Sequence, residues 1–186
     1  MSSFVTTLYP SVELIDSVVF KDINADENIY FSKPFLKAFE IANPQIEFKY
    51  ISIADAYKNT VALALVQVIR LNVEGMLKNI KVAPFVRKGL GLLFCNEHIK
   101  IMFCGNVFLS GEHGISASKN ASKKDVYSEI GTALDAVAAN TNPMHAIFIK
   151  DFKLASLANT KQFLNFGYSE IKVEPNMIIQ LKPEWK

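Results

Sequence analysis

The chain is poor in cysteine and tryptophan, and neither sign of charge dominates it. Its 186 residues include two cysteines and one tryptophan, and 20 basic residues are balanced by 18 acidic ones. Two thiols are too few for the disulfide framework of a small secreted domain. A net charge of +2 is too even for a protein whose main task is to bind nucleic acid or an anionic membrane.

Long apolar runs are also missing. The longest apolar stretch, 61–73, is interrupted by Gln67, Arg70 and Asn72, whereas a membrane helix needs about 20 apolar residues. The N-terminus has no basic segment of the kind that opens a signal peptide. The sequence therefore predicts a cytoplasmic protein with no membrane span.

Apolar and aromatic residues are plentiful. Half of the residues are hydrophobic and 11% are aromatic, which excludes an intrinsically disordered chain. A chain of this length buries roughly 70% of its unfolded surface, enough for a core without metal or disulfides. We expect a single domain over residues 1–186. Its core should occupy 31–182, because the apolar residues of 1–30 follow no clean period.

Two stretches of alternating residues, 46–53 and 61–73, predict an antiparallel hairpin. The second stretch is apolar at successive positions in its first half, which predicts a central strand covered on both faces. Residues 32–40 before the hairpin predict a helix. We expect Ser32 to cap it and Pro34 to lie in its first turn.

The second half of the chain alternates strand and helix patterns. The expected elements are a strand at 99–104, a glycine-rich turn at 105–114, a loop at 116–124, a helix at 125–140, a strand at 145–150, a helix at 153–165, and closing strands at 168–173 and 177–181. Residues 76–94 fit a broken helix or a mobile segment. This order predicts an α/β or α+β fold, with a mixed, mainly antiparallel sheet and helices on both faces.

The same order of elements resembles the GNAT acyltransferase superfamily over about residues 31–182. A narrower resemblance rests on residues 104–114 (CGNVFLSGEHG), 149–152 (IKDF) and 175–179 (PNMII). These runs are similar to the first module of Fem-type, two-module GNAT-like proteins of Bacteroidetes. The resemblance implies an N-acyltransferase that uses acyl-CoA, such as acetyl-CoA, and a small or peptide-like amine. It also implies a second GNAT-like module or a second copy as partner.

One departure from the GNAT pattern leaves an alternative open. GNAT enzymes usually carry a Gln/Arg-x-x-Gly-x-Gly/Ala loop before the cofactor helix, and residues 111–124 do not have this spacing. The first module of Fem-type proteins commonly lacks a working cofactor site. The alternative is therefore a non-catalytic module that binds a ligand or docks onto another module.

The glycine-rich turn at 105–114 contains the first candidate site. Glu112 is a candidate general base and His113 a candidate proton shuttle, because both are ionisable and lie between glycines. Asn106 and Ser110 are candidate substrate contacts in the same turn. The alternative is a structural bulge in which Glu112 pairs with a lysine or caps backbone amides.

The strand expected at 145–150 ends in two further candidates. Lys150 and Asp151 are candidate substrate-binding residues, since ligands of open α/β sheets bind at the carboxyl ends of strands. The alternative is an ion pair between them and a cap for the following helix.

The loop at 116–124 precedes a helix and is basic. Ser122, Lys123 and Lys124 are candidate cofactor-binding residues, because a helix N-terminus with nearby lysines attracts phosphate. The alternative is a solvated loop in which Ser122 only caps the helix. No cluster of Cys, His or carboxylate residues has the spacing of a metal site.

A remote third hypothesis is a cysteine hydrolase. Cys104 and His113 would be nucleophile and base if the thiol and the imidazole came within hydrogen-bond reach. In an apolar strand, however, a cysteine is more often a small core residue.

Overall fold

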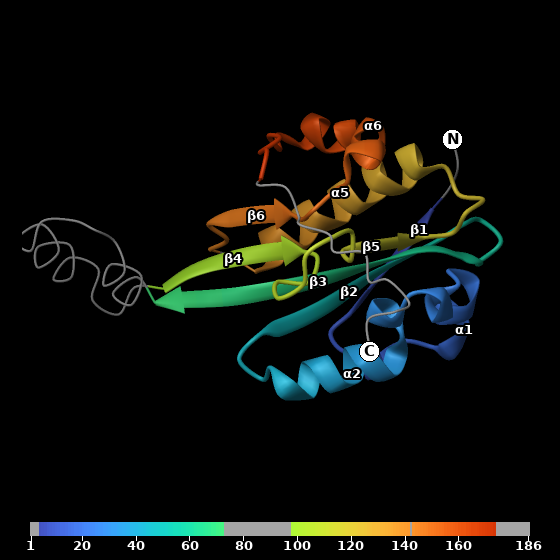
Figure 1. Ribbon diagram of the computed structural model, residues 1–186, viewed down its shortest axis with the longest axis horizontal. Helices are drawn as coiled ribbons and strands as arrows, with labels where there is room; N and C mark the ends of the chain where they lie inside the picture. The colour runs from blue at the N-terminus through green and yellow to red at the C-terminus, as the bar shows by residue number, and fades with distance from the viewer. Residues whose placement is uncertain (1–3, 73–97, 142, 174–186) are drawn as a thin grey trace, which may run out of the picture.

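The computed structural model describes residues 4–72, 98–141 and 143–173, and a six-stranded sheet forms their centre (Figure 1). Its strands are β1 (Val5–Tyr9), β2 (Glu47–Ala54), β3 (Thr60–Asn72), β4 (His98–Cys104), β5 (Ile115–Ala117) and β6 (Ala146–Ile149). They lie in the order β1-β2-β3-β4-β6, and β5 also pairs with β3. Only β4 and β6 run parallel. The predicted mixed, mainly antiparallel sheet is confirmed.

Helices cover both faces of this sheet, as predicted. The α-helices are α1 (Ser17–Asp22), α2 (Lys33–Ala42), α5 (Lys123–Asn140) and α6 (Leu157–Thr160). The 3-10 turns are η1 (Val12–Leu14), η2 (Ala25–Glu27), η3 (Ile29–Phe31), η4 (Leu154–Ser156) and η5 (Lys161–Phe166). In Figure 1, α1 and α2 lie below the sheet and α5 and α6 above it. None of the helices in the described ranges is long and apolar enough to cross a membrane.

Alternate residues of β3 belong to two separate cores. Ala64 and Val66 pack in the cluster that includes Ile130 of α5, whereas Leu63 and Leu65 pack in the cluster that includes Leu36 of α2. All six side chains are at most 1% exposed. The central strand buried on both faces is therefore confirmed, and it divides the molecule into an α5 side and an α2 side.

Both β4 and β5 pair with β3, and the chain leaves the sheet between them. The amide of Gly105 donates to the carbonyl of Leu65, and the amide of Leu65 donates to the carbonyl of Gly114. Both ends of the intervening segment are thus fixed to one residue of β3. This segment, here called the 105–114 loop, starts where β4 ends, and both of its ends are bonded to β3.

The first thirty residues, which showed no period, contain an edge strand. β1 pairs antiparallel with β2, and four of its five residues are exposed. A strand exposed on both faces carries no alternation of apolar and polar residues, so the pattern could not indicate it. Ser32 precedes α2 but does not cap it; its hydroxyl donates to the carbonyl of Ile29. Pro34 lies in the first turn as expected.

The predicted boundaries are wrong in two places after β4. Ser116 and Ala117 belong to β5 rather than to a loop, and α5 begins at Lys123 rather than at residue 125. The three residues of β5 are too few for a period to indicate a strand. The helix predicted at 125–140 and the strand at 145–150 are otherwise confirmed.

The C-terminal expectations hold only in part. The helix predicted at 153–165 is divided into η4, α6 and η5, and it ends at Gly167 with a left-handed φ of 80°. Residues 168–173 form no strand, so that prediction is wrong. Tyr168 packs on Phe163, at 6.0 Å between ring centroids, rather than extending along the sheet. The strand predicted at 177–181 and the segment 76–94 lie outside the described residues.

Candidate functional site

A cavity of about 210 Å³ opens on the α5 side of the sheet. It is lined by Cys104 and Ile149, the last residues of the parallel strands β4 and β6, and by Lys123 at the start of α5. Glu112 of the 105–114 loop and Phe152 also line it. The cavity thus lies at the carboxyl ends of two parallel neighbouring strands, where α/β sheets bind ligands.

Glu112 is held at this cavity by a backbone hydrogen bond. Its Oε1 accepts from the amide of Lys153 at 2.7 Å. Tyr127 of α5 also lines the cavity; burial, together with the charge of Glu112 and Cys104, raises its pKa to about 12. The cavity therefore combines one carboxylate with a hydroxyl that stays protonated at neutral pH. Glu112 can accept a proton there, and the Tyr127 hydroxyl can donate a hydrogen bond.

His113, the neighbour of Glu112, lies on the α2 side instead. Its ring contacts that of Tyr30 in η3, at 4.2 Å between centroids. Burial lowers the pKa of His113, and the positive charge of Lys153 lowers it further. Glu112 lies at the centre of a tight turn, in which the amide of His113 donates to the carbonyl of Gly111, and of the two candidate catalytic residues only Glu112 lines the cavity.

Lys150 stabilises the 105–114 loop. Its ammonium donates to the carbonyls of Asn106, Val107 and Leu109 at 2.9, 3.5 and 3.2 Å, and lies 3.4 Å from a carboxylate oxygen of Asp151. The ion pair of the alternative interpretation is therefore present. Lys150 also lines the cavity, but its donors are used by the loop.

Within the 105–114 loop, Asn106 is buried, whereas Ser110 is exposed. The Asn106 Oδ1 accepts from the amide of Phe108 at 3.0 Å, and the Oε1 of Gln67 in β3 accepts from the amide of Val107 at 2.8 Å. Neither Asn106 nor Ser110 lines the cavity. Sequence reasoning missed Gln67, although a glutamine at a core position of β3 was a visible signal.

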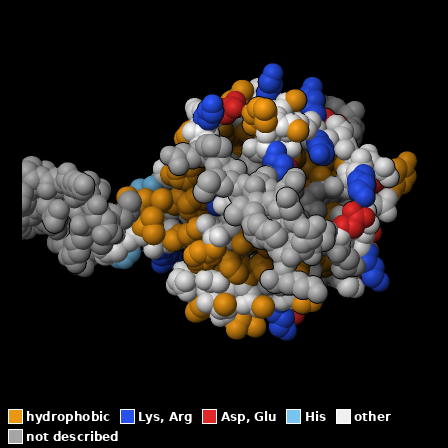
Figure 2. Space-filling view, in the orientation of Figure 1, with side chains coloured by type: hydrophobic (Ala, Val, Ile, Leu, Met, Phe, Trp, Pro, Cys, Tyr) orange, Lys and Arg blue, Asp and Glu red, His pale blue; other side chains and the backbone are white. Residues whose placement is uncertain are grey.

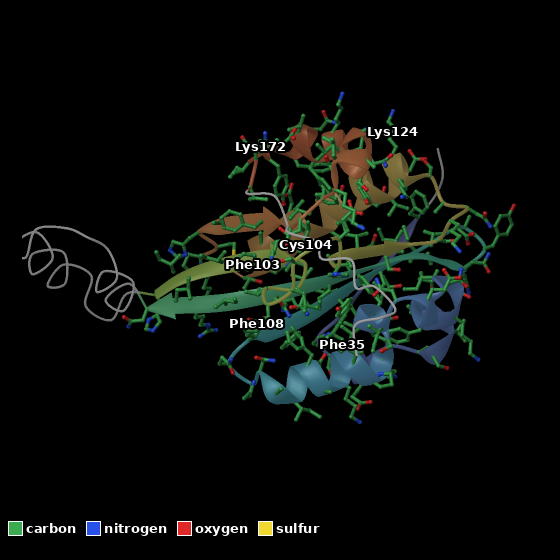
Figure 3. All side chains as sticks on the ribbon, in the orientation of Figure 1. Phe35, Phe103, Cys104, Phe108, Lys124 and Lys172 are labelled. Carbon is green, nitrogen blue, oxygen red and sulfur yellow. The ribbon has the colours of Figure 1, made fainter. Side chains whose placement is uncertain are left out.

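The three candidate cofactor residues differ in position. Ser122 is the N-cap of α5, and its hydroxyl accepts from the amide of Asp125 at 3.4 Å. Lys123 lines the cavity. Lys124 is exposed and lies at the outer start of α5 (Figure 3). Tyr127 was missed, although its spacing of four from Lys123 places both on one side of a helix.

Cys104 is a core residue with an unreactive thiol. It is completely buried, and burial raises its pKa to about 12. A thiol with this pKa is almost wholly protonated at neutral pH, whereas nucleophilic cysteines need a thiolate. His113 is not among the residues that line the cavity beside Cys104. The hydrolase hypothesis therefore receives no support from the geometry.

Comparisons with known proteins do not identify the chain. No family model matches it, and neither a curated protein nor a solved structure is significantly similar to it. Within the described ranges, no group of three or more His, Cys, Asp or Glu side chains could bind a metal ion.

Proposed function

We propose that this chain is a GNAT-like N-acyltransferase module that transfers an acyl group from acyl-CoA to an amine. The observation that carries the proposal is the cavity at the carboxyl ends of β4 and β6, which Glu112 and Lys123 at the start of α5 both line. The succession of β4, α5 and β6 along the chain supports this proposal. We further propose a cytoplasmic protein that works with a second GNAT-like module or a second copy.

The residues around the cavity fit the phosphates of CoA. Ser122 satisfies the amides of Asp125 and Val126, so the amides of the first two residues of α5 are left for solvent or an anion. Lys123 adds a positive charge on the cavity itself. Figure 2 shows basic side chains gathered over the α5 and α6 part of the molecule.

The remaining lining fits the acyl end and the proton transfer. Ile149 and Phe152 supply an apolar wall, and the thioester of acyl-CoA would supply the activated acyl group. Glu112 would accept the proton of the attacking amine while the amide of Lys153 keeps its carboxylate in place. As the new amide bond forms and the C–S bond of the thioester breaks, the Tyr127 hydroxyl, which its raised pKa keeps protonated, would donate a hydrogen bond to the CoA thiolate that leaves.

Calorimetric titration with acetyl-CoA tests the cofactor site. We expect saturable binding that Lys123→Glu weakens and that Lys161→Glu, an exposed lysine of η5, leaves unchanged. A ligand at 100 times its dissociation constant stabilises a protein by about 2.7 kcal/mol, so the melting temperature should also rise. Absence of both heat and thermal shift would contradict the cofactor site.

Glu112→Gln tests the chemistry separately from binding. Glutamine keeps an oxygen that accepts from the amide of Lys153 but cannot act as a base. We expect acetyl-CoA to bind the variant as it binds the natural chain, while release of free CoA with a panel of amines falls by roughly 10²–10⁴-fold. Equal release by both proteins would contradict the role of Glu112.

Specific observations favour the non-catalytic module as second candidate. The Lys150 ammonium is used by backbone carbonyls, and His113 lies away from the cavity. At about 210 Å³, the cavity is below the roughly 300–1,000 Å³ of typical ligand pockets. Binding of acetyl-CoA without CoA release for any amine would favour this candidate.

A further inference from the structure

The 105–114 loop brings Glu112 to the cavity, yet it has few hydrogen bonds of its own. All of its residues are described, and a single backbone–backbone hydrogen bond joins two of them, from the amide of His113 to the carbonyl of Gly111. The bonds between the loop and Leu65 of β3 fix only its two ends. The path between these ends therefore depends on contacts from outside the loop.

Three such contacts come from one side chain, that of Lys150, which directly follows β6. The carbonyls of Asn106, Val107 and Leu109 accept from its ammonium at distances between 2.9 and 3.5 Å. A carboxylate oxygen of Asp151 lies 3.4 Å from the same ammonium, and the Lys150 side chain is only 21% exposed. Several backbone oxygens and one carboxylate around a positive charge form the arrangement of a cation site. Here the chain supplies the cation itself.

The turn that contains Lys150 also holds Glu112 directly. The amide of Lys153 donates to the Oε1 of Glu112 at 2.7 Å. Between the two lysines, Asp151 has a left-handed φ of 59°, which a non-glycine residue keeps only where its surroundings require it. This turn thus sets an ammonium and an amide against the same loop, the first bonded to the loop backbone and the second to the carboxylate of Glu112.

From these contacts we infer that Lys150 is a positioning residue for Glu112: its ammonium acts as a built-in cation that keeps the 105–114 loop in the conformation in which the carboxylate lines the cavity. Lys150 acts through the loop and not on a ligand, because an ammonium turned toward a ligand would leave three carbonyls without this donor. The consequence for catalysis rests on the proposed function. The position of Glu112 does not, and it can be measured on the chain without any ligand.

Hydrogen exchange of the Lys153 amide in the ligand-free, 15N-labelled chain measures that position. Lys150→Met removes the ammonium and keeps an apolar stem. We expect the Lys153 amide to exchange roughly tenfold faster in this variant, the effect of losing one hydrogen bond to a charged group, and about as fast as in Glu112→Ala, which lacks the acceptor. Lys100→Met is the matched control and should change nothing, since the Lys100 ammonium also donates to a backbone carbonyl, that of Thr141, but near the start of β4. Unchanged exchange in a folded Lys150→Met variant would overturn the proposal.

Rescue by a small cation separates the charge of Lys150 from its bulk. Lys150→Ala lacks the outer methylene groups and the ammonium, which n-propylammonium replaces, and Lys150 lines the cavity, where a small ion can enter. We expect n-propylammonium to restore slow exchange of the Lys153 amide with saturation, and tetramethylammonium, a cation without N–H donors, to have no effect. Equal effects of the two cations, or no effect of either, would show that the ammonium does not hold the loop. If one of the two Lys150 variants does not fold, the other decides.

CoA release from acetyl-CoA with a panel of amines tests the catalytic consequence. We expect Lys150→Met to lower kcat roughly 10²-fold, the cost of a base misplaced by about 1 Å, and to leave the KM for acetyl-CoA unchanged. An unchanged kcat in a variant whose Lys153 amide exchanges fast would overturn this consequence. If the natural chain itself releases no CoA, the proposed function fails, while the amide exchange still decides the role of Lys150.

Discussion

Gly114 is the residue at which the two ends of the 105–114 loop approach each other most closely. A Cβ atom built there would lie 2.8 Å from the carbonyl oxygen of Cys104 and 3.0 Å from the Cα of Gly105. These neighbours are backbone atoms of β4 and the loop, so they cannot move without breaking the pairing with β3. Glycine at this position is thus what lets Glu112 and His113 occupy a closed loop.

We predict that Gly114→Ala lowers the free energy of unfolding by about 1–3 kcal/mol, the usual cost of forcing extra volume into a packed site. Gly167→Ala is the matched control. Gly167 has a left-handed φ of 80° but open space around its Cα, so its substitution should cost only roughly 1 kcal/mol. Urea unfolding of both variants checks the order. A smaller loss for Gly114→Ala than for Gly167→Ala would contradict the close approach.

Single residues of the site were predictable where the reason is local. The glycine spacing indicated the turn around Glu112, and Ser122 caps α5 as one alternative held. The role of Lys150 was not predictable, because its ammonium bonds to carbonyls more than 40 residues away along the chain. The separation of His113 from Glu112 likewise depends on Tyr30, in a segment without a readable period.

The helices α5 and η5 pack closely against each other at Gly131 and Phe166. A Cβ built at Gly131 of α5 would lie 2.6, 2.7 and 3.0 Å from three ring atoms of Phe166 in η5. Glycine has a lower helix propensity than alanine, which makes α5 less stable by about 1 kcal/mol. It is compatible with the fold because it lets the Phe166 ring lie directly on the helix backbone.

A double-mutant cycle measures this contact. We predict that Gly131→Ala alone destabilises the chain by about 1–2 kcal/mol, because the ring must move away from α5. In a Phe166→Leu background the same substitution should be neutral or stabilising, since only the gain in propensity is left. Chemical denaturation of the four proteins gives the coupling energy. Additive effects would show that the two residues do not interact.

The sequence correctly indicated the elements in which apolar residues recur at regular spacing. β3 and α5 bury apolar residues at the spacings of strand and helix, and their existence and type were predicted. Three parts of the chain are too short or too exposed to show a period: β1, β5 and the divided segment 154–166. Their secondary structure therefore depends on the residues packed around them. Residues 168–173 show the reverse error, because they form no strand although their pattern alternates.

The molecule as a whole buries several groups that must lose a proton to become charged. Cys104, Tyr127 and Tyr168 lie in or against the core on the α5 side, and Tyr50 lies in the core on the α2 side. Burial raises the pKa of each group, to about 12 for Cys104 and for Tyr127. The folded state thus keeps protons that the unfolded chain releases at alkaline pH.

The sign of the resulting pH dependence follows from proton binding. Below about pH 8.5, the ordinary pKa of a thiol, Cys104 is protonated in both states and its contribution to stability is complete. Between about pH 8.5 and 12 the unfolded chain binds fewer protons than the folded one, so the free energy of unfolding falls as the pH rises. The tyrosines add to this loss above about pH 10, the ordinary pKa of their hydroxyls.

We therefore predict that Cys104 alone costs the fold about 2 kcal/mol between pH 8.5 and 10, at up to 1.4 kcal/mol per pH unit. Urea unfolding at a series of pH values measures the slope, and Cys104→Ala is the matched comparison. The variant should be less stable at pH 7, because it leaves a cavity, yet its stability should fall less steeply over this window. All other titrating groups, Cys95 included, are common to both proteins, and the tyrosines whose pKa the charge of Cys104 affects add their own loss only above about pH 10. Parallel curves for the two proteins would show that the Cys104 thiol ionises as readily in the folded chain as in the unfolded one.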